Sequence, residues 1–211
     1  MLPLEQCRLY AFVDTAYLRG RNPVEIARQL CDGGADLIQL RAKQSTVDEI
    51  RQMALSILPV TRRANVGLVI NDHLELACEI GADFCHLGQE DYEQMRISEG
   101  GFRKAKNDVR IGLSTHAPDQ AGRAVEAGAD YVAVGPVYPT ATKPGAKPVT
   151  LDYVRWAAQN VTVPWFAIGG INLTNLADVL AAGARRICVV SAILNAPSVA
   201  DACAEFRKRL D

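Results

Sequence analysis

The stretch Gly128-Ala129-Asp130-Tyr131-Val132-Ala133-Val134-Gly135 joins the end of a predicted helix to a buried strand. Its four apolar residues, 131 to 134, form a short run of the kind found in strands covered on both faces. The glycine at position 128 is typical of a residue that ends a helix in the left-handed conformation. The stretch therefore predicts a helix end, a tight connection and a parallel strand, in that order.

The same pattern recurs along the chain. Gly-Ala-Asp also occurs at residues 34–36 and 81–83, and Gly183-Ala184-Arg185 is a close variant. Each copy precedes an apolar run, and these runs are the second, fourth, sixth and eighth of eight. The eight runs are Leu9 to Val13, Leu37 to Leu40, Gly67 to Ile70, Phe84 to Leu87, Val109 to Leu113, Tyr131 to Val134, Trp165 to Ile168 and Ile187 to Val190. Such an internal repeat indicates a fold built from repeated units.

Segments with helical periodicity alternate with the runs. Their predicted starts are Asn22-Pro23, Ser45 or Thr46, Leu74, Ala117-Pro118, Thr150, Asn172 or Thr174, and Pro197-Ser198. Strands that alternate with helices form parallel sheets joined by right-handed crossovers. Eight units predict a closed (β/α)8 TIM barrel, with residues 1–211 as one catalytic domain. An open doubly wound sheet is the alternative, but it does not explain the repeat spacing, and no GxGxxG motif is present.

Composition excludes several classes of protein. Lys and Arg total 23 and Asp and Glu total 24 among 211 residues, which argues against a nucleic-acid or membrane-surface partner. We expect no signal peptide and no membrane span. The six cysteines lack zinc-ligand spacing, so we interpret them as small buried hydrophobes of a cytoplasmic protein.

In a barrel of this class the active site forms at the carboxyl ends of the strands. The second strand is predicted to end in Gln39-Leu40-Arg41-Ala42-Lys43. Alternation places Gln39, Arg41 and Lys43 on one side, towards the mouth. Two cations and an amide there favour an anion, since arginine binds phosphate oxygens in pairs. The alternative is a pair that faces outward and is neutralised by carboxylates of the helices.

Carboxylates follow the next two strands. The third strand is followed by Asn71-Asp72 and the fourth by Gly88-Gln89-Glu90-Asp91. Two carboxylates at neighbouring strand ends repel each other unless a cation lies between them. Beside a diphosphate we expect Mg2+, with Asp72 and Asp91 as ligands and Glu90 as a substitute for Asp91. The competing interpretation of Asp72 is an N-cap for the following helix.

Hydroxyl groups, a lysine and glycines follow the remaining strands. Ser114 and His116 end the fifth strand, and a Ser–His nucleophile pair is the alternative to phosphate binding by Ser114. The loop Gly135 to Gly145 carries Thr140, Thr142 and Lys143. Backbone N–H groups near Gly169, Gly170, Val190 and Ser191 favour a phosphate after the seventh and eighth strands. The mouth is therefore predicted to have two anion sites, one for each of two phosphorylated substrates.

These motifs together resemble those of the thiamine phosphate synthase family, nearly end to end. The matching segments are Gln39-Leu40-Arg41-x-Lys43, Asn71-Asp72, His86 to Asp91, Gly112 to His116, Gly135-Pro136-Val137-Tyr138-Pro139-Thr140-x-Thr142-Lys143, Ala167 to Ile171, and Val190-Ser191. The resemblance implies a Mg2+-dependent transferase that joins 4-amino-2-methyl-5-(diphosphooxymethyl)pyrimidine to a thiazole phosphate. Diphosphate would leave by dissociative substitution at the pyrimidine methylene.

The resemblance also implies roles for the motif residues. The pyrimidine diphosphate would be held by Gln39, Arg41, Lys43, Asn71, Ser114 and Lys143, of which Arg41, Lys43, Ser114 and Lys143 are expected to be catalytic. The thiazole phosphate would be held by Thr140, Thr142, Gly170, Val190 and Ser191. Leu40, Ala42, Ala141 and Gly169 complete the expected substrate-binding set, and Asp72 and Asp91 would bind Mg2+. A homodimer is the assembly to test.

Two features of the chain depart from the family pattern, and two other functions compete with this assignment. Ala42 replaces the glutamate found in many relatives, and the segment Gln94 to Asn107 is longer than usual, which we interpret as an elaborated helix. We also hypothesise that the loop Pro139 to Pro148 closes over the substrates. A thiazole tautomerase would need an acid or base such as His116 but not the diphosphate set. A non-catalytic phosphate-binding relative is the second alternative.

Overall fold

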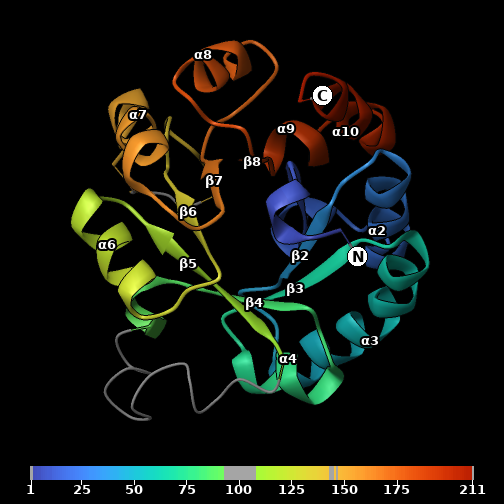
Figure 1. The fold of residues 1–211 in the computed structure, drawn as a ribbon. Helices are drawn as coiled ribbons and strands as arrows, with labels where there is room; N and C mark the ends of the chain where they lie inside the picture. The colour runs from blue at the N-terminus through green and yellow to red at the C-terminus, as the bar shows by residue number, and fades with distance from the viewer. Residues whose placement is uncertain (1, 93–107, 143–144, 146, 211) are drawn as a thin grey trace.

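The computed structural model describes residues 2–92, 108–142, 145 and 147–210. Eight parallel strands form a closed barrel in which each strand pairs with its neighbours in sequence and β8 pairs with β1. Helices surround the barrel (Figure 1). This arrangement confirms the predicted (β/α)8 barrel and excludes the open sheet. The strands are β1 (Leu9–Asp14), β2 (Leu37–Arg41), β3 (Gly67–Asn71), β4 (Phe84–Leu87), β5 (Arg110–Thr115), β6 (Tyr131–Val134), β7 (Trp165–Ile168) and β8 (Ile187–Cys188).

Most helices begin where the capping residues predict. Asn22 accepts hydrogen bonds from Val24 N and Glu25 N, and Thr46 forms a capping box with Glu49. The predicted start of the next-to-last helix at Asn172 or Thr174 is wrong. Asn172 forms a turn instead, and α8 begins only at Leu176. The helices are η1 (Leu4–Gln6), α1 (Thr15–Leu18), α2 (Pro23–Asp32), α3 (Val47–Ala64), α4 (Leu74–Ile80), α6 (Pro118–Glu126), α7 (Thr150–Asn160), α8 (Leu176–Ala181), α9 (Ser191–Leu194) and α10 (Val199–Lys208).

The Gly-Ala-Asp repeat has a structural role at the amino ends of the strands. Each repeat glycine has a positive φ, including 83° at Gly34 and 86° at Gly128, as expected after a helix. Each aspartate accepts a hydrogen bond from the backbone of the preceding strand: Asp36 from Leu9 N at 2.9 Å, Asp83 from Leu68 N at 2.9 Å, and Asp130 from Ile111 N at 2.7 Å. The repeat therefore ties neighbouring strands together at the end of the barrel opposite the expected active site.

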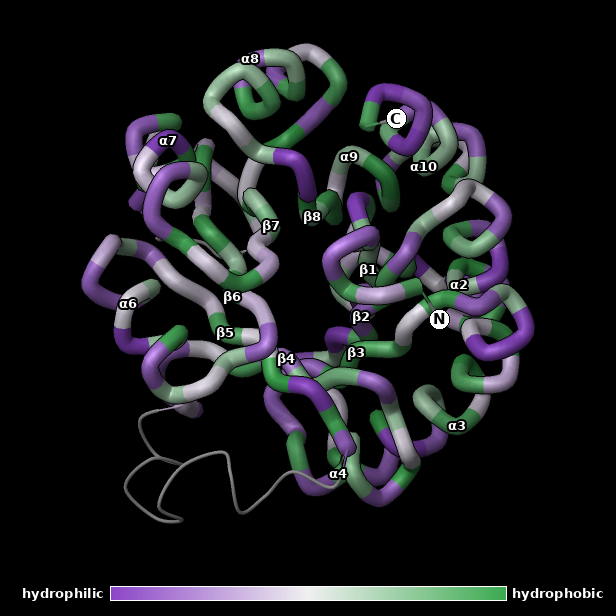
Figure 2. The backbone as a smooth tube through the Cα atoms, in the orientation of Figure 1, coloured by the Kyte–Doolittle hydropathy of each residue, from purple (hydrophilic) through white to green (hydrophobic). Residues whose placement is uncertain are grey.

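The core has two layers because strand side chains alternate in direction. Residues such as Leu9, Ala11 and Val13 of β1 pack outward against the helices. The intervening residues, including Tyr10 and Phe12, fill the inside of the barrel with other aromatic side chains. Hydrophobic residues recur along the ring of strands, whereas the helices alternate in hydropathy (Figure 2).

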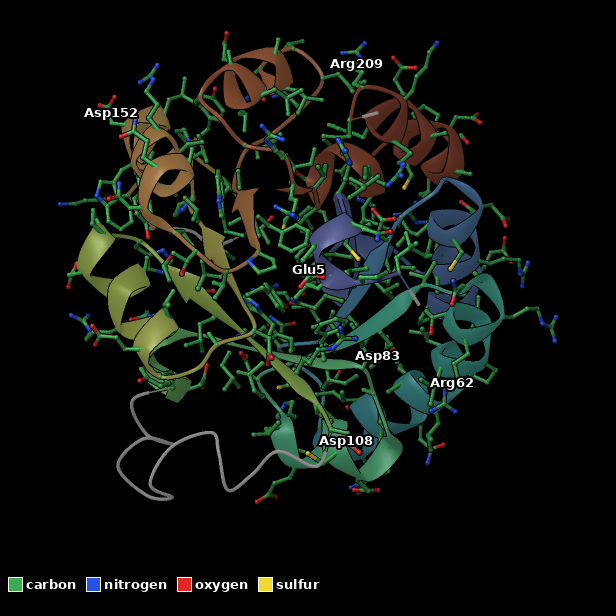
Figure 3. The ribbon with its side chains drawn as sticks, viewed as in Figure 1. Glu5, Arg62, Asp83, Asp108, Asp152 and Arg209 are labelled. Carbon is green, nitrogen blue, oxygen red and sulfur yellow. The ribbon has the colours of Figure 1, made fainter. Side chains whose placement is uncertain are left out.

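The 3-10 helix η1 lies near the barrel axis, where Glu5 is labelled in Figure 3, and Leu4 and Cys7 join the interior cluster. Asp152 on α7 and Arg209 after α10 lie on the outer ring. Among the described residues, no helix combines the length and the apolar character that a membrane crossing requires.

Candidate active site

Two adjoining cavities open at the carboxyl ends of the strands. Both are lined by Ser114, Thr142 and Val190. The first cavity is also lined by His116, Thr140, Gly169, Gly170 and Ser191. The second is also lined by Tyr10, Gln39, Arg41, Asn71 and His86. Gln39, Arg41 and Asn71 therefore line only the second of the two spaces, and Thr140, Gly170 and Ser191 line only the first.

Arg41 is held by a carboxylate that the sequence analysis did not select. Its Nη1 lies 2.8 Å from Oδ2 of Asp14, which is only 1% exposed at the end of β1. Nη2 donates at 3.4 Å to the carbonyl oxygen of Thr142. Asp14 and Arg41 are paired residues in the β1–β2 register, so the barrel sets them side by side. The guanidinium keeps further N–H donors for a ligand.

Lys43 and Asn71 both contact Asp72. Lys43 Nζ forms an ion pair with Asp72 Oδ2, and Asn71 Nδ2 donates to the same oxygen at 2.6 Å. Asp72 N donates to the carbonyl oxygen of His86 at 2.8 Å, which ties the end of β3 to β4. The N-cap of α4 is His73, without a side-chain cap, so the alternative in which Asp72 caps that helix is wrong. Arg41 lines the second cavity, so the outward-facing alternative is wrong for this residue.

Asp91 lies near Asp72, and the pair provides a test of the expected metal site. The pKa of Asp91 is raised, first by burial and then by the charge of Asp72. Asp91 Oδ2 also accepts a hydrogen bond from Gly88 N at 3.2 Å. Within the described part of the chain, no three His, Cys, Asp or Glu side chains form a metal-binding group. Two carboxylates fit Mg2+, which commonly takes its other ligands from water and phosphate oxygens.

Ser114 contacts His86 rather than the neighbouring His116. Ser114 Oγ lies 3.0 Å from His86 Nε2, while His86 Nδ1 lies 3.1 Å from the hydroxyl of Tyr131. Burial lowers the pKa of His86 to about 4, which makes it a weak base at neutral pH. The His86 ring is bonded to a tyrosine where a triad would have a carboxylate. This geometry does not support the Ser–His nucleophile.

The side chain of His116 is directed towards the carboxyl end of the next strand, β6. Its Nδ1 donates to the carbonyl oxygen of Gly135, and its backbone N donates to Gln120 Oε1 at 2.7 Å. The ring also lines the first cavity. His116 therefore anchors the start of the loop after β6.

The loop after β6 is bonded to the end of β7. Val137 N donates to the carbonyl oxygen of Ile168 at 2.8 Å, and Tyr138 N donates to that of Gly169 at 3.0 Å. A Cβ at Gly169 would overlap Pro136, and one at Gly170 would lie 2.6 Å from the oxygen of Pro139. Both glycines have positive φ, 102° and 65°. They therefore permit a close approach between the two loops, in addition to lining the cavity.

Hydrogen bonds within the site orient Thr140 and Thr142 of this loop. Thr142 Oγ1 lies 2.9 Å from the hydroxyl of Tyr17 on α1, and Thr142 N donates to Thr140 Oγ1 at 3.2 Å. Ser191 begins α9 and lines the same cavity beside Val190. Lys143 lies outside the described residues, as do 94–107 and parts of the loop 139–148, so their predicted roles stay predictions.

Three members of the expected substrate-binding set have other surroundings. The side chains of Leu40 and Ala42 are buried in the layer between barrel and helices, so only their backbone can face a ligand. Ala141 is exposed in the loop after β6. Period-two alternation accounts for Leu40 and Ala42, because they flank the inward-facing Arg41.

Sequence reasoning missed Asp14, Tyr17 and Gln89. Gln89 Nε2 donates to the carbonyl oxygen of Ser114 at 2.6 Å, which joins the ends of β4 and β5. Asp14 had a detectable signal, because it is an acidic residue directly after an apolar strand on the same inward face as Tyr10 and Phe12. Tyr17 had none, since its partner Thr142 is 125 positions away.

Comparisons with known proteins point to one family. The family model described as thiamine monophosphate synthase matches residues 9–193. The thiamine-phosphate synthase of Thermus thermophilus is 48% identical over 181 residues, covering 84% of each chain. That of Acidothermus cellulolyticus is 43% identical over 210 residues, covering 98% of this chain and 96% of the relative. The solved structure of thiamine phosphate pyrophosphorylase from Pyrococcus furiosus superposes with a TM-score of 0.84 at 30% identity, covering 98% of this chain and 96% of the other.

Proposed function

The chain belongs to the thiamine monophosphate synthase family and is a transferase, and from this premise we propose its substrates and the role of each site residue. The substrates are 4-amino-2-methyl-5-(diphosphooxymethyl)pyrimidine and a thiazole phosphate. The products are thiamine phosphate and diphosphate. The observation that carries the proposal is the pair of adjoining cavities, one with the Arg41 guanidinium and the side-chain amides of Gln39 and Asn71, and the other with hydroxyls and loop backbone.

The pyrimidine diphosphate is assigned to the cavity lined by Gln39, Arg41, Asn71 and Ser114. Arg41 is partly exposed and already oriented by Asp14, so it can donate to diphosphate oxygens with little loss of side-chain freedom. Lys43, whose side chain is 52% exposed, can exchange its contact with Asp72 for a phosphate oxygen. Lys143 joins this set on the strength of the sequence motif.

Asp72 and Asp91 are the residues that would hold Mg2+. Support comes from the raised pKa of Asp91, because two nearby carboxylates gain stability when a cation lies between them. A bound Mg2+ would supply positive charge beside the diphosphate. Arg41 and Lys43 supply such charge from the protein itself.

The reaction breaks the bond between the pyrimidine methylene carbon and the diphosphate oxygen, with both bonding electrons leaving on diphosphate. The thiazole nitrogen then donates its lone pair to that carbon, so no protein nucleophile is required. Arg41 and Lys43 stabilise the negative charge that grows on the leaving group. The adjoining cavities hold the two rings near each other, which lowers the entropic part of the barrier.

The thiazole phosphate is assigned to the cavity lined by Thr140, Thr142, Gly170, Val190 and Ser191. The hydroxyls of Thr140 and Ser191 can donate to phosphate oxygens, and Gly170 brings backbone close to the ligand. Tyr17 holds Thr142 in place, which orients the loop at the boundary between the cavities.

The proposed location is the cytoplasm, because free cysteines fit a reducing compartment. A homodimer is the proposed assembly, and size-exclusion chromatography with light scattering would test it.

The deciding experiment measures thiamine phosphate formed from both substrates with Mg2+, with and without EDTA, by wild type and Asp72→Ala. Formation that requires metal and is largely lost in the variant is expected. Product that persists with EDTA and in the variant would remove the Mg2+ assignment. Folded protein that forms no product but binds the thiazole phosphate would favour the tautomerase or the non-catalytic relative.

A further inference from the structure

Three buried side chains connect Gln39 to Ser114 across the inside of the barrel. Gln39 Nε2 donates to the hydroxyl of Tyr10 at 2.5 Å, and that hydroxyl lies 3.1 Å from the hydroxyl of Tyr131. The Tyr131 hydroxyl lies 3.1 Å from His86 Nδ1, and His86 Nε2 lies 3.0 Å from Ser114 Oγ. Tyr10, Tyr131 and His86 are 1%, 0% and 8% exposed. Both ends of this chain of hydrogen bonds line the cavity assigned to the pyrimidine.

The direction of these hydrogen bonds follows from the Gln39 amide nitrogen, which can only donate, and from the single proton on each tyrosine hydroxyl. An amide nitrogen only donates, so the Tyr10 oxygen accepts from Gln39 and directs its one proton to Tyr131. Tyr131 in turn directs its proton to His86 Nδ1. The imidazole proton is then on Nε2 and is donated to Ser114 Oγ. The proton of Ser114 itself stays free to be donated into the cavity.

The opposite direction leaves a buried donor unsatisfied. If His86 carried its proton on Nδ1, Tyr131 would donate to Tyr10, which already accepts from Gln39. Among the described residues, Tyr10 has no third hydrogen-bond partner, so its proton would have no acceptor. An unsatisfied buried hydroxyl is unfavourable, and the first direction avoids it.

The ionisation of these side chains supports the same direction. A neutral His86 ring with one N–H satisfies both of its contacts, because one nitrogen accepts from the Tyr131 hydroxyl while the other donates to Ser114 Oγ. Burial raises the pKa of Tyr10 and Tyr131 well above the usual value, so both keep their protons. Each of the three side chains Tyr10, Tyr131 and His86 therefore has a single proton to donate.

We propose that Tyr10 and Tyr131 are positioning residues which, through His86, fix the Ser114 hydroxyl as a hydrogen-bond donor to the pyrimidine diphosphate. This inference rests on the proposed function, because it assigns Ser114 to that substrate. The acceptor on the substrate is a diphosphate oxygen or a ring nitrogen. The amide orientation of Gln39 sets the direction of all the hydrogen bonds, so Gln39 also acts on Ser114 from across the barrel.

The fold makes specific room for these side chains. A Cβ at Gly112 would overlap the ring and the hydroxyl of Tyr131, so only glycine at this position admits the tyrosine. The ring packs against Phe84, Phe166 and Tyr10. Tyr131→Phe keeps these contacts and removes only the hydroxyl, which makes it a suitable variant.

The first test is made on the wild-type protein. Long-range 1H–15N NMR spectra at neutral pH report which imidazole nitrogen carries the proton, and His86→Asn serves to identify the His86 signals among the three histidines. The expected result is a proton on Nε2 of His86. A proton on Nδ1 would reverse the direction and overturn the proposal.

The second test compares the two substrates. In Tyr131→Phe, titration calorimetry with Mg2+ is expected to show roughly tenfold weaker binding of the pyrimidine diphosphate and unchanged binding of the thiazole phosphate, as for the loss of one oriented hydrogen bond to a charged group. Tyr153→Phe is the matched control, because its buried hydroxyl contacts Thr115 Oγ1 at 2.8 Å outside both cavities. Unchanged pyrimidine binding in Tyr131→Phe, or equal weakening for both substrates, would contradict the proposal.

The two proposals can fail separately. An inactive wild type with the Nε2 proton in place would refute the proposed function and leave the direction of the hydrogen bonds intact. An active wild type with the proton on Nδ1 would refute only the positioning role.

Discussion

The guanidinium of Arg41 lies 2.8 Å from the carboxylate of Asp14, its register partner on the neighbouring strand. Asp14 Oδ1 also accepts from Ala16 N at 3.0 Å and so begins α1. One buried carboxylate thus orients the principal cation of the site and the helix that carries Tyr17. Loss of its charge would disturb both.

Asp14→Asn should therefore lower both turnover and stability. The amide can still accept from Ala16 N, but it cannot form the ion pair. We expect kcat to fall by about tenfold or more and the free energy of unfolding by about 1–3 kcal/mol. Steady-state kinetics and urea unfolding measure the two effects. A variant with wild-type kinetics would show that Arg41 is oriented without Asp14.

Asp91→Asn should remove the response of stability to Mg2+. Burial, and after it the charge of Asp72, raise the pKa of Asp91, so its charge is disfavoured and the amide should raise the melting temperature without metal. Mg2+ should raise the melting temperature of wild type but not of this variant. Thermal unfolding with and without MgCl2 measures both. Glu90→Gln is the matched control, and loss of the response there instead would move the ligand to Glu90.

His86 should make the protein less stable in mild acid. Its folded pKa of about 4 is below the unfolded value of about 6.5, because burial disfavours the charged ring. The unfolded state binds more protons between these values, so stability is complete above pH 6.5 and declines as pH falls towards 4, by about 3 kcal/mol in all. Urea unfolding at several pH values, with His86→Asn alongside, isolates this contribution. Parallel curves for the two proteins would contradict it.

Gly112→Ala and Gly122→Ala should have opposite effects. The first places a methyl group in the Tyr131 ring, and we expect a loss of about 3 kcal/mol or failure to fold. Gly122 is exposed within α6 with open space around it, so alanine there should stabilise by about 0.5–1 kcal/mol. Chemical unfolding measures both. Equal effects would mean that space around Tyr131 is not the reason for Gly112.

Asp83→Ala should reduce stability and leave catalysis unchanged. Its carboxylate accepts from Leu68 N at the end of the barrel opposite the active site. We expect a loss of about 1–2 kcal/mol with kcat and KM as in wild type. A large fall in kcat for a variant that is still folded would show that the two ends of the barrel are coupled.

The sequence predicted much of the site because strands alternate and parallel strands end on one side. Arg41 and Asp72 could be assigned to the mouth from these rules alone. The role of His86 could not, since nothing near it in sequence distinguishes a histidine bonded to Ser114 from one that only fills the core. The same holds for Tyr10 and Tyr131, which have the pattern of ordinary interior residues.

The sequence by itself determined the order of strands and helices, the closed barrel and the direction in which strand residues point. These properties follow from local hydrogen bonding, glycine conformation and apolar periodicity, which act over a few residues. Only the tertiary structure decided that Asp14 meets Arg41, that His86 meets Ser114, and that Tyr10 meets Tyr131. These partners are 27, 28 and 121 positions apart, and they meet because barrel closure brings distant strands to a common axis.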